Sequence, residues 1–185
     1  MKILGLDSSG IVASVAIVED ENLIAEYTVN YKKTHSQTLL PMLDELAKMT
    51  ELDLDTIDAI AVAAGPGSFT GLRIGSATAK GLGLALKKPL VEIPTVDALA
   101  YNLYDAKALV CPIMDARRSQ VYTGIYRFED HKLVTVEAQM AVPMSELIEK
   151  LNGRGEEVIF LGDGVPVFAK MIEENLKVPY SFAPA

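Results

Sequence analysis

The same order of strand-like and helical patterns occurs twice along this chain, and this repetition is the strongest constraint on its fold. In the first half, three strand-like runs precede a helix, a strand, a second helix and a further strand. These elements are expected at residues 3–6, 11–18, 23–29, 37–48, 57–64, 70–86 and 90–93. Three strands followed by alternating helices and strands predict an α/β layer architecture with a mixed sheet.

The second half repeats the order β-β-β-α-β-α without evident sequence identity to the first. Its elements are expected at residues 109–114, 121–128, 133–140, 145–151, 158–161 and 165–176. We therefore predict two related α/β domains, residues 1–102 and 103–185. The end of the chain, residues 178–185, has loop composition, so we expect no closing element there and a second domain that is truncated at its C-terminus.

The charge of the chain argues against nucleic-acid binding by the protein alone. Seventeen Lys and Arg against 25 Asp and Glu give a net charge of −8. Phosphate binding needs clustered cations, but the basic clusters are only pairs: Lys32–Lys33, Lys87–Lys88 and Arg117–Arg118. No apolar run approaches the ~20 residues of a membrane span, and the N-terminal run is too short for a signal peptide. We expect a cytoplasmic protein.

The cysteine and the histidines do not suggest a reactive centre. Cys111 lies in an expected apolar strand, which favours a structural thiol over a nucleophile. His35 and His131 are far apart in the sequence, and neither has a His, Cys or acidic cluster at ligand spacing. We therefore expect no metal site in this chain and assign both histidines surface or capping roles.

Three loops of small residues are candidates for a phosphate-binding or nucleotide-binding site. The segment 7–10 could offer amides, hydroxyls and a magnesium-binding carboxylate, or it could be a tight turn that bonds its own backbone. The segment 65–73 carries a strand into a helix, so it is either an anion site or a glycine-dependent turn capped by Ser68 or Thr70. Gly162-Asp163-Gly164 could accept an adenine-bearing ligand. The weak cofactor candidates are Asp7, Ser8, Ser9, Gly65, Gly67, Gly162 and Gly164.

A stripe of small residues runs along the expected helix 70–86. Glycine costs a helix about 1 kcal/mol relative to alanine, so this stripe needs a compensating close approach, either of the protein's own sheet or of a partner helix. We favour approach of a partner helix, and we expect one apolar row of the helix 37–48 to belong to the same interface. The predicted interface is Leu39, Leu43, Leu46, Gly71, Gly75, Ala79 and Gly83.

One further turn combines a carboxylate with two guanidinium groups. Asp115, Arg117 and Arg118 follow an expected strand, where they could form ion pairs or contact an anion. A solvated turn explains them equally well.

Four segments together resemble the bacterial TsaB family, also called YeaZ. They are residues 64–75 (AGPGSFTGLRIG), 4–9 (LGLDSS), 35–41 (HSQTLLP) and 114–122 (MDARRSQVY), in the family's order. The resemblance covers residues 3 to about 164. It implies an actin-like, Hsp70-like fold of two duplicated domains.

The resemblance also implies a function. It suggests a non-catalytic subunit that binds the catalytic paralogue TsaD during threonylcarbamoyl transfer to the adenosine beside the anticodon of ANN-decoding tRNAs. TsaD carries a metal-binding His-x-x-x-His pair, whereas the matching stretch here, residues 93–99, has no histidine, and Thr95 and Leu99 cannot replace it. The implied direct partner is TsaD. A TsaE-like ATPase and tRNA are reached through that complex, and a nucleotide binds only within it. The isolated chain is expected to form a homodimer.

Two enzymatic alternatives compete with this interpretation. A small-molecule kinase or ATPase of the same superfold would use Asp7 for magnesium and the glycine loops for nucleotide. A metalloprotease is a second alternative, and the missing metal ligands argue against it.

Overall fold

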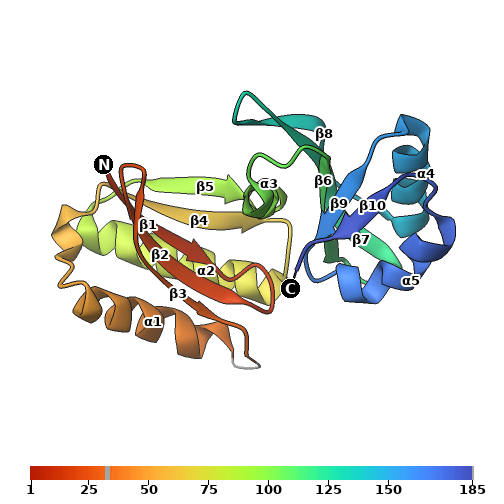
Figure 1. The fold of residues 1–185 in the computed structure, drawn as a ribbon. Helices are drawn as coiled ribbons and strands as arrows, with labels where there is room; N and C mark the ends of the chain where they lie inside the picture. The colour runs from red at the N-terminus through yellow and green to blue at the C-terminus, as the bar shows by residue number, and fades with distance from the viewer. Residues whose placement is uncertain (32–33, 185) are drawn as a thin grey trace. The chain divides into compact units, whose positions relative to one another are not determined.

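The structure is a computed structural model that describes residues 1–31 and 34–184 (Figure 1). It separates into two compact units, Met1–Thr95 and Val96–Ala185. The Lys32–Lys33 pair lies outside the described residues. Within the described ranges no helix is both long and apolar enough to cross a lipid bilayer.

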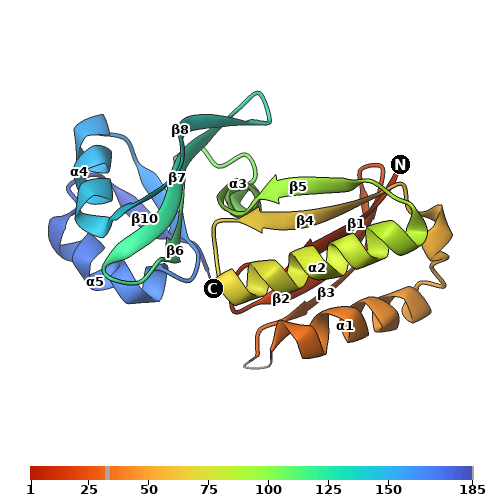
Figure 2. The same cartoon turned by 180° about the vertical axis from the view of Figure 1, so that it is seen from behind.

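The first unit has one five-stranded mixed sheet with two helices on one face (Figure 2). Its elements are β1 (Lys2–Asp7), β2 (Ala13–Glu19), β3 (Asn22–Val29), α1 (His35–Met49), a 3-10 turn (Leu54–Thr56), β4 (Ala59–Gly65), α2 (Phe69–Leu86) and β5 (Leu90–Pro94). The strand order is β3-β2-β1-β4-β5, in which β1, β2 and β3 pair antiparallel while β1, β4 and β5 pair parallel. Alternate residues such as Leu4, Leu6, Val15 and Ile17 are buried in one cluster with residues of both helices.

The second unit repeats this topology. It contains α3 (Thr95–Ala100, which begins at the boundary), a 3-10 turn (Tyr101–Leu103), β6 (Leu109–Asp115), β7 (Gln120–Glu129), β8 (Lys132–Pro143), α4 (Met144–Arg154), β9 (Val158–Leu161), α5 (Val165–Asn175) and β10 (Tyr180–Phe182). Its strand order is β10-β9-β6-β7-β8, so each strand takes the place of its counterpart in the first sheet. The prediction of two duplicated α/β domains of mixed sheets is confirmed.

The central strand β6 explains how the second unit forms three layers. Leu109, Cys111 and Ile113 are buried in a cluster that includes residues of α4 and α5. Val110 and Met114, which alternate with them, are buried in a second cluster with Val96 and Ala100 of α3. The sheet therefore lies between α3 and the α4–α5 pair.

Three local expectations differ from the structure. The expected absence of a closing element is wrong, because Tyr180–Phe182 forms β10, which pairs parallel with β9. Three residues are too few to show the alternation of apolar and polar residues that predicts a strand. Residues 34–37 have the Thr-x-x-Gln form of a capping box, which predicts a side-chain cap, but Thr34, the N-cap of α1, makes no such bond. The same helix begins at His35 and includes Pro41.

Candidate functional site

The glycine loop between β4 and α2 packs against the end of β1. Gly67 has a φ of +159°, and a Cβ there would overlap the Ser9 carbonyl oxygen. Ser68 N donates to that oxygen at 2.7 Å, and Ser68 Oγ caps α2 by accepting from Gly71 N at 3.2 Å. The close approach of two backbones thus requires the glycine, and Ser68 is the cap that the sequence suggested.

The turn that follows β1 completes this cluster from the other side. Asp7 Oδ1 accepts a hydrogen bond from Ser9 N at 2.7 Å, which is the self-bonded turn expected for an Asp at this position. Ser8 is buried, and its hydroxyl donates to Gly71 O at 2.9 Å. His35 Nε2 lies 2.9 Å from Gly10 O and joins the start of α1 to the same turn.

The structure therefore brings Asp7, Ser8, Ser9, Gly65 and Gly67 together at one end of the first sheet. The amides of Ser9 and Ser68 and one Asp7 oxygen bond within the chain. A phosphate or a magnesium ion would have to compete with these bonds. This geometry is that of a structural junction.

The predicted interface stripe on α2 faces the protein's own sheet, and that prediction is wrong. Gly71, Gly75, Ala79 and Gly83 are all buried. A Cβ on Gly71 would overlap the Ser8 carbonyl oxygen, and one on Gly75 would lie 2.5 Å from Ser8 Oγ. Close approach of α2 to the turn after β1 is the gain that offsets the cost of glycine in a helix.

The prediction that leucines of α1 form the interface is also wrong, because these leucines are buried against the protein's own sheet. Leu39, Leu43 and Leu46 are at most 4% exposed and belong to the core of the first unit. The outward face carries other apolar residues, which the spacing did not distinguish: Leu40 is 51% exposed and Leu84 of α2 is 83% exposed. The two helices lie side by side on the sheet, as Figure 2 shows.

Thr95 and Leu99, the positions compared above with the His-x-x-x-His pair of TsaD, have packing roles. Thr95 is buried, and its hydroxyl accepts a hydrogen bond from Gly65 N at 3.2 Å. Leu99 packs in the second unit, where its Cδ2 would lie 3.2 Å from a Cβ on Gly162. Across residues 1–31 and 34–184, no three His, Cys, Asp or Glu side chains are grouped so that they could hold a metal ion.

The candidate loop of the second unit repeats the packing of the first. Gly164 N donates to Ile113 O at 3.0 Å, and a Cβ on Gly162 or Gly164 would crowd that same carbonyl. Asp163 Oδ1 accepts from Asp115 N at 3.1 Å. Gly162 and Gly164 therefore fit the start of α5 against the end of β6.

The turn between β6 and β7 has an unusual backbone that the sequence did not indicate. Arg117, Arg118 and Ser119 have φ values of +65°, +53° and +58°. A left-handed conformation costs a non-glycine residue about 1–2 kcal/mol, and Arg and Ser give no sequence signal for it. The turn therefore stores strain.

The remaining cysteine and histidine have structural surroundings. Desolvation in the core raises the pKa of the Cys111 thiol to about 12, although Thr123 hydrogen-bonds it, so the thiolate is strongly disfavoured. His131 lies in the turn before β8, where its Nδ1 is 3.2 Å from Asp105 Oδ2. Cys111 is thus placed as the structural thiol that was expected.

Comparisons with known proteins find similarity to TsaB proteins and to tRNA threonylcarbamoyltransferases. A family model described as "TsaD: tRNA N6-adenosine threonylcarbamoyltransferase" matches residues 22–183. The tRNA threonylcarbamoyladenosine biosynthesis protein TsaB of Bacillus subtilis is 35% identical over 176 residues, which cover 95% of this chain and 77% of that protein. A tRNA N6-adenosine threonylcarbamoyltransferase of Fervidobacterium nodosum is 34% identical over 152 residues, covering 74% of this chain and 45% of the enzyme.

The fold comparison gives the same answer. YeaZ from Pseudomonas aeruginosa superimposes with a TM-score of 0.81 and 26% identity, covering 100% of this chain and 84% of that one. The whole of this chain, with its two sheets of the same topology, is included in the superposition. The chain therefore belongs to the TsaB family of tRNA threonylcarbamoyladenosine biosynthesis proteins.

Proposed function

We propose that this chain is a non-catalytic subunit of the cytoplasmic machinery that makes threonylcarbamoyladenosine in tRNA. In this proposal it binds and activates a TsaD-like catalytic paralogue, and it meets a TsaE-like ATPase and tRNA only within that complex. The transferred threonylcarbamoyl group goes to the adenosine beside the anticodon of ANN-decoding tRNAs.

The observation that carries the proposal is the use of Thr95 and Leu99. These residues stand where the resemblance to TsaD implies a pair of metal-binding histidines. Thr95 bonds Gly65 N and Leu99 packs in an apolar cluster, so both positions serve the fold. A hydroxyl and an isobutyl group cannot replace two neutral imidazoles as ligands.

The outward face of α1 and α2 supports a role in binding a partner. Leu40 of α1 and Leu84 of α2 are exposed apolar residues on neighbouring helices, and in this proposal the partner covers them. Because TsaD is a paralogue, its corresponding helices would form a pseudo-symmetric contact with this face, and a second copy would take that place in the isolated chain.

Sedimentation of the chain mixed with a TsaD-like enzyme tests this proposal. Leu84→Arg puts a charge on the exposed face and should abolish the heterodimer while leaving the melting temperature unchanged. The matched control is Val167→Arg on α5, where a 56% exposed valine lies on a helix of the second unit. A heterodimer that survives Leu84→Arg, or that both variants weaken equally, would contradict the assignment of this face.

A further inference from the structure

The strained turn between β6 and β7 carries two arginines where other residues would fit more easily. Glycine adopts positive φ without cost, and Asn or Asp with little. The chain instead has Arg117, Arg118 and Ser119 in succession. Strained residues of this kind persist where the surrounding structure fixes them, and they are concentrated at functional positions.

Hydrogen bonds from three elements hold this turn in place. Gln120 N donates to Arg117 O at 3.0 Å, and Met144 N, at the start of α4, donates to Ser119 O at 3.0 Å. Asp115 Oδ1 accepts from Arg117 N at 2.9 Å. These bonds hold the backbone on both sides of Arg118, at Arg117 and Ser119, which reduces the entropy lost on binding.

The two arginines differ in their ionic partners. The Arg117 guanidinium lies 3.1 Å from Asp115 Oδ2, so its charge is balanced although the side chain is 87% exposed. Arg118 is also exposed, and no acidic side chain in the described part of the chain forms an ion pair with it. The turn thus presents one uncompensated cation beside a second that is oriented by a carboxylate.

We propose that the turn Asp115–Gln120 binds the phosphate backbone of RNA, with Arg118 as the main phosphate contact. The planar guanidinium matches the oxygens of a phosphate group and can bind two of them at once. The proposal rests on the function proposed above, because tRNA is the RNA on which that complex would act. At a net charge of −8 the turn contributes as one part of a surface completed by the partner.

A glycine substitution separates binding from folding at this turn. Arg118→Gly removes the charge and relieves the strain at φ +53°, so the melting temperature should stay equal or rise. Affinity of the assembled complex for tRNA should fall by about 10-fold, the loss of one charge-assisted contact. The slope of log affinity against log salt should become shallower by about 1. Arg118→Lys, which keeps the charge, should retain that slope.

Lys87→Gly is the matched control. Lys87 is also an exposed cation in a left-handed conformation, with φ +56° at the C-cap of α2. Its replacement should leave tRNA affinity unchanged. The readout is anisotropy of a fluorescent tRNA titrated with the complex between about 50 and 200 mM salt, after sedimentation has confirmed assembly.

The outcomes separate this inference from the proposed function. If the complex assembles and Arg118→Gly binds tRNA as tightly as the wild type, or both glycine variants weaken binding equally, only this inference is overturned. If Arg118→Gly prevents assembly with the enzyme, the turn contacts protein and the RNA assignment is wrong. If the wild-type chain does not assemble, both the proposed function and this inference fail.

Discussion

Two glycines of α2, Gly71 and Gly81, have opposite surroundings although they belong to the same helix. A Cβ on Gly71 would overlap the Ser8 carbonyl oxygen, whereas one on Gly81 would meet nothing within 4 Å. Gly71→Ala should therefore destabilise the fold by about 1–3 kcal/mol through overpacking. Gly81→Ala should stabilise it by about 1 kcal/mol through helix propensity. Urea unfolding measures both, and shifts of the same sign would contradict the packing of α2 on β1.

Tyr126 gives the second unit a dependence on alkaline pH. Its hydroxyl donates to Asp97 Oδ1 at 2.6 Å, and burial, followed by this bond to a carboxylate, raises the pKa of Tyr126 well above its usual range. The unfolded chain loses the phenolic proton near pH 10, about the usual tyrosine value, while the folded chain keeps it. This contribution to stability is therefore present below about pH 10 and is lost as the pH rises above it.

Tyr126→Phe tests that contribution. The variant should lose about 1–2 kcal/mol at pH 7, because a partly buried carboxylate loses its donor. Its stability should then fall less steeply than that of the wild type above about pH 10. Denaturant unfolding at a series of pH values is the measurement, and Tyr31→Phe, at a 65% exposed tyrosine, is the control. Equal alkaline slopes for wild type and Tyr126→Phe would contradict this account.

At the scale of elements, adjacent leucines of α1 have different roles. Leu39 is 1% exposed and Leu40 is 51% exposed. Leu40→Asp should weaken self-association of the isolated chain without lowering its stability. Leu39→Ala should cost about 2–5 kcal/mol by leaving a cavity in the core. Sedimentation and thermal unfolding of the two variants check this contrast, and an unchanged dimer in Leu40→Asp would count against the outward face as the contact.

Sequence patterns predicted most helices and strands, but they did not predict which surfaces the residues of those elements contact. The two sheets follow from apolar runs separated by turn residues, and Ser68 as a cap follows from local chemistry. The surface that Gly75 and Leu43 face could not be predicted from the sequence. The spacing of small or apolar residues is the same whether the chain's own sheet or a partner covers them. The left-handed conformation of Arg117 and Arg118 could not be predicted either, because the residue types do not favour it and the bond from Met144 N to Ser119 O joins positions distant in the sequence.

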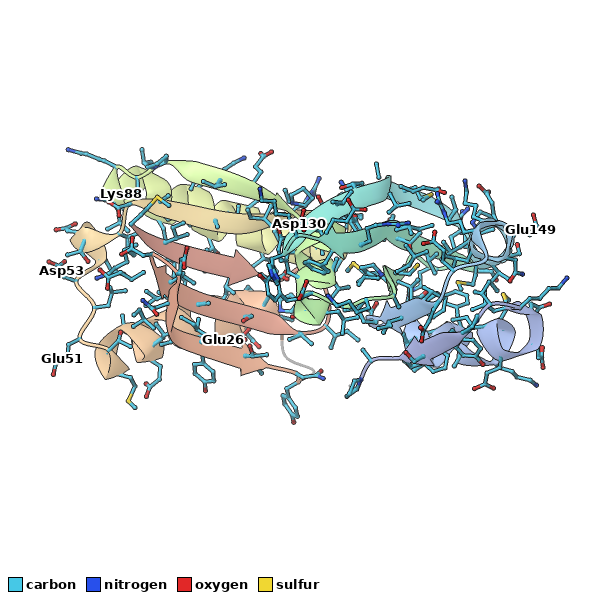
Figure 3. The ribbon with its side chains drawn as sticks, turned by 45° about the horizontal axis from the view of Figure 1, so that its top comes forward. Glu26, Glu51, Asp53, Lys88, Asp130 and Glu149 are labelled. Atoms are coloured by element: carbon cyan, nitrogen blue, oxygen red, sulfur yellow. The ribbon has the colours of Figure 1, made fainter. Side chains whose placement is uncertain are left out.

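At the scale of the whole molecule, acidic side chains outnumber basic ones by 25 to 17. Exposed carboxylates such as Glu51, Asp53 and Glu149 occur in both units (Figure 3), and the net charge is −8. Long-range repulsion of a polyanion follows from this charge. We therefore expect that any contribution of the chain to tRNA modification requires the proposed complex.

Threonylcarbamoyl transfer to unmodified tRNA by purified components tests that dependence most directly. The reaction is run with a threonylcarbamoyl donor and either this chain, a TsaD-like enzyme, or both. We predict no transfer by the chain alone, little by the enzyme alone and efficient transfer by the mixture, with Leu84→Arg reducing the mixture to the level of the enzyme. Transfer by the chain alone, or a mixture no faster than the enzyme, would contradict the account of a non-catalytic activating subunit.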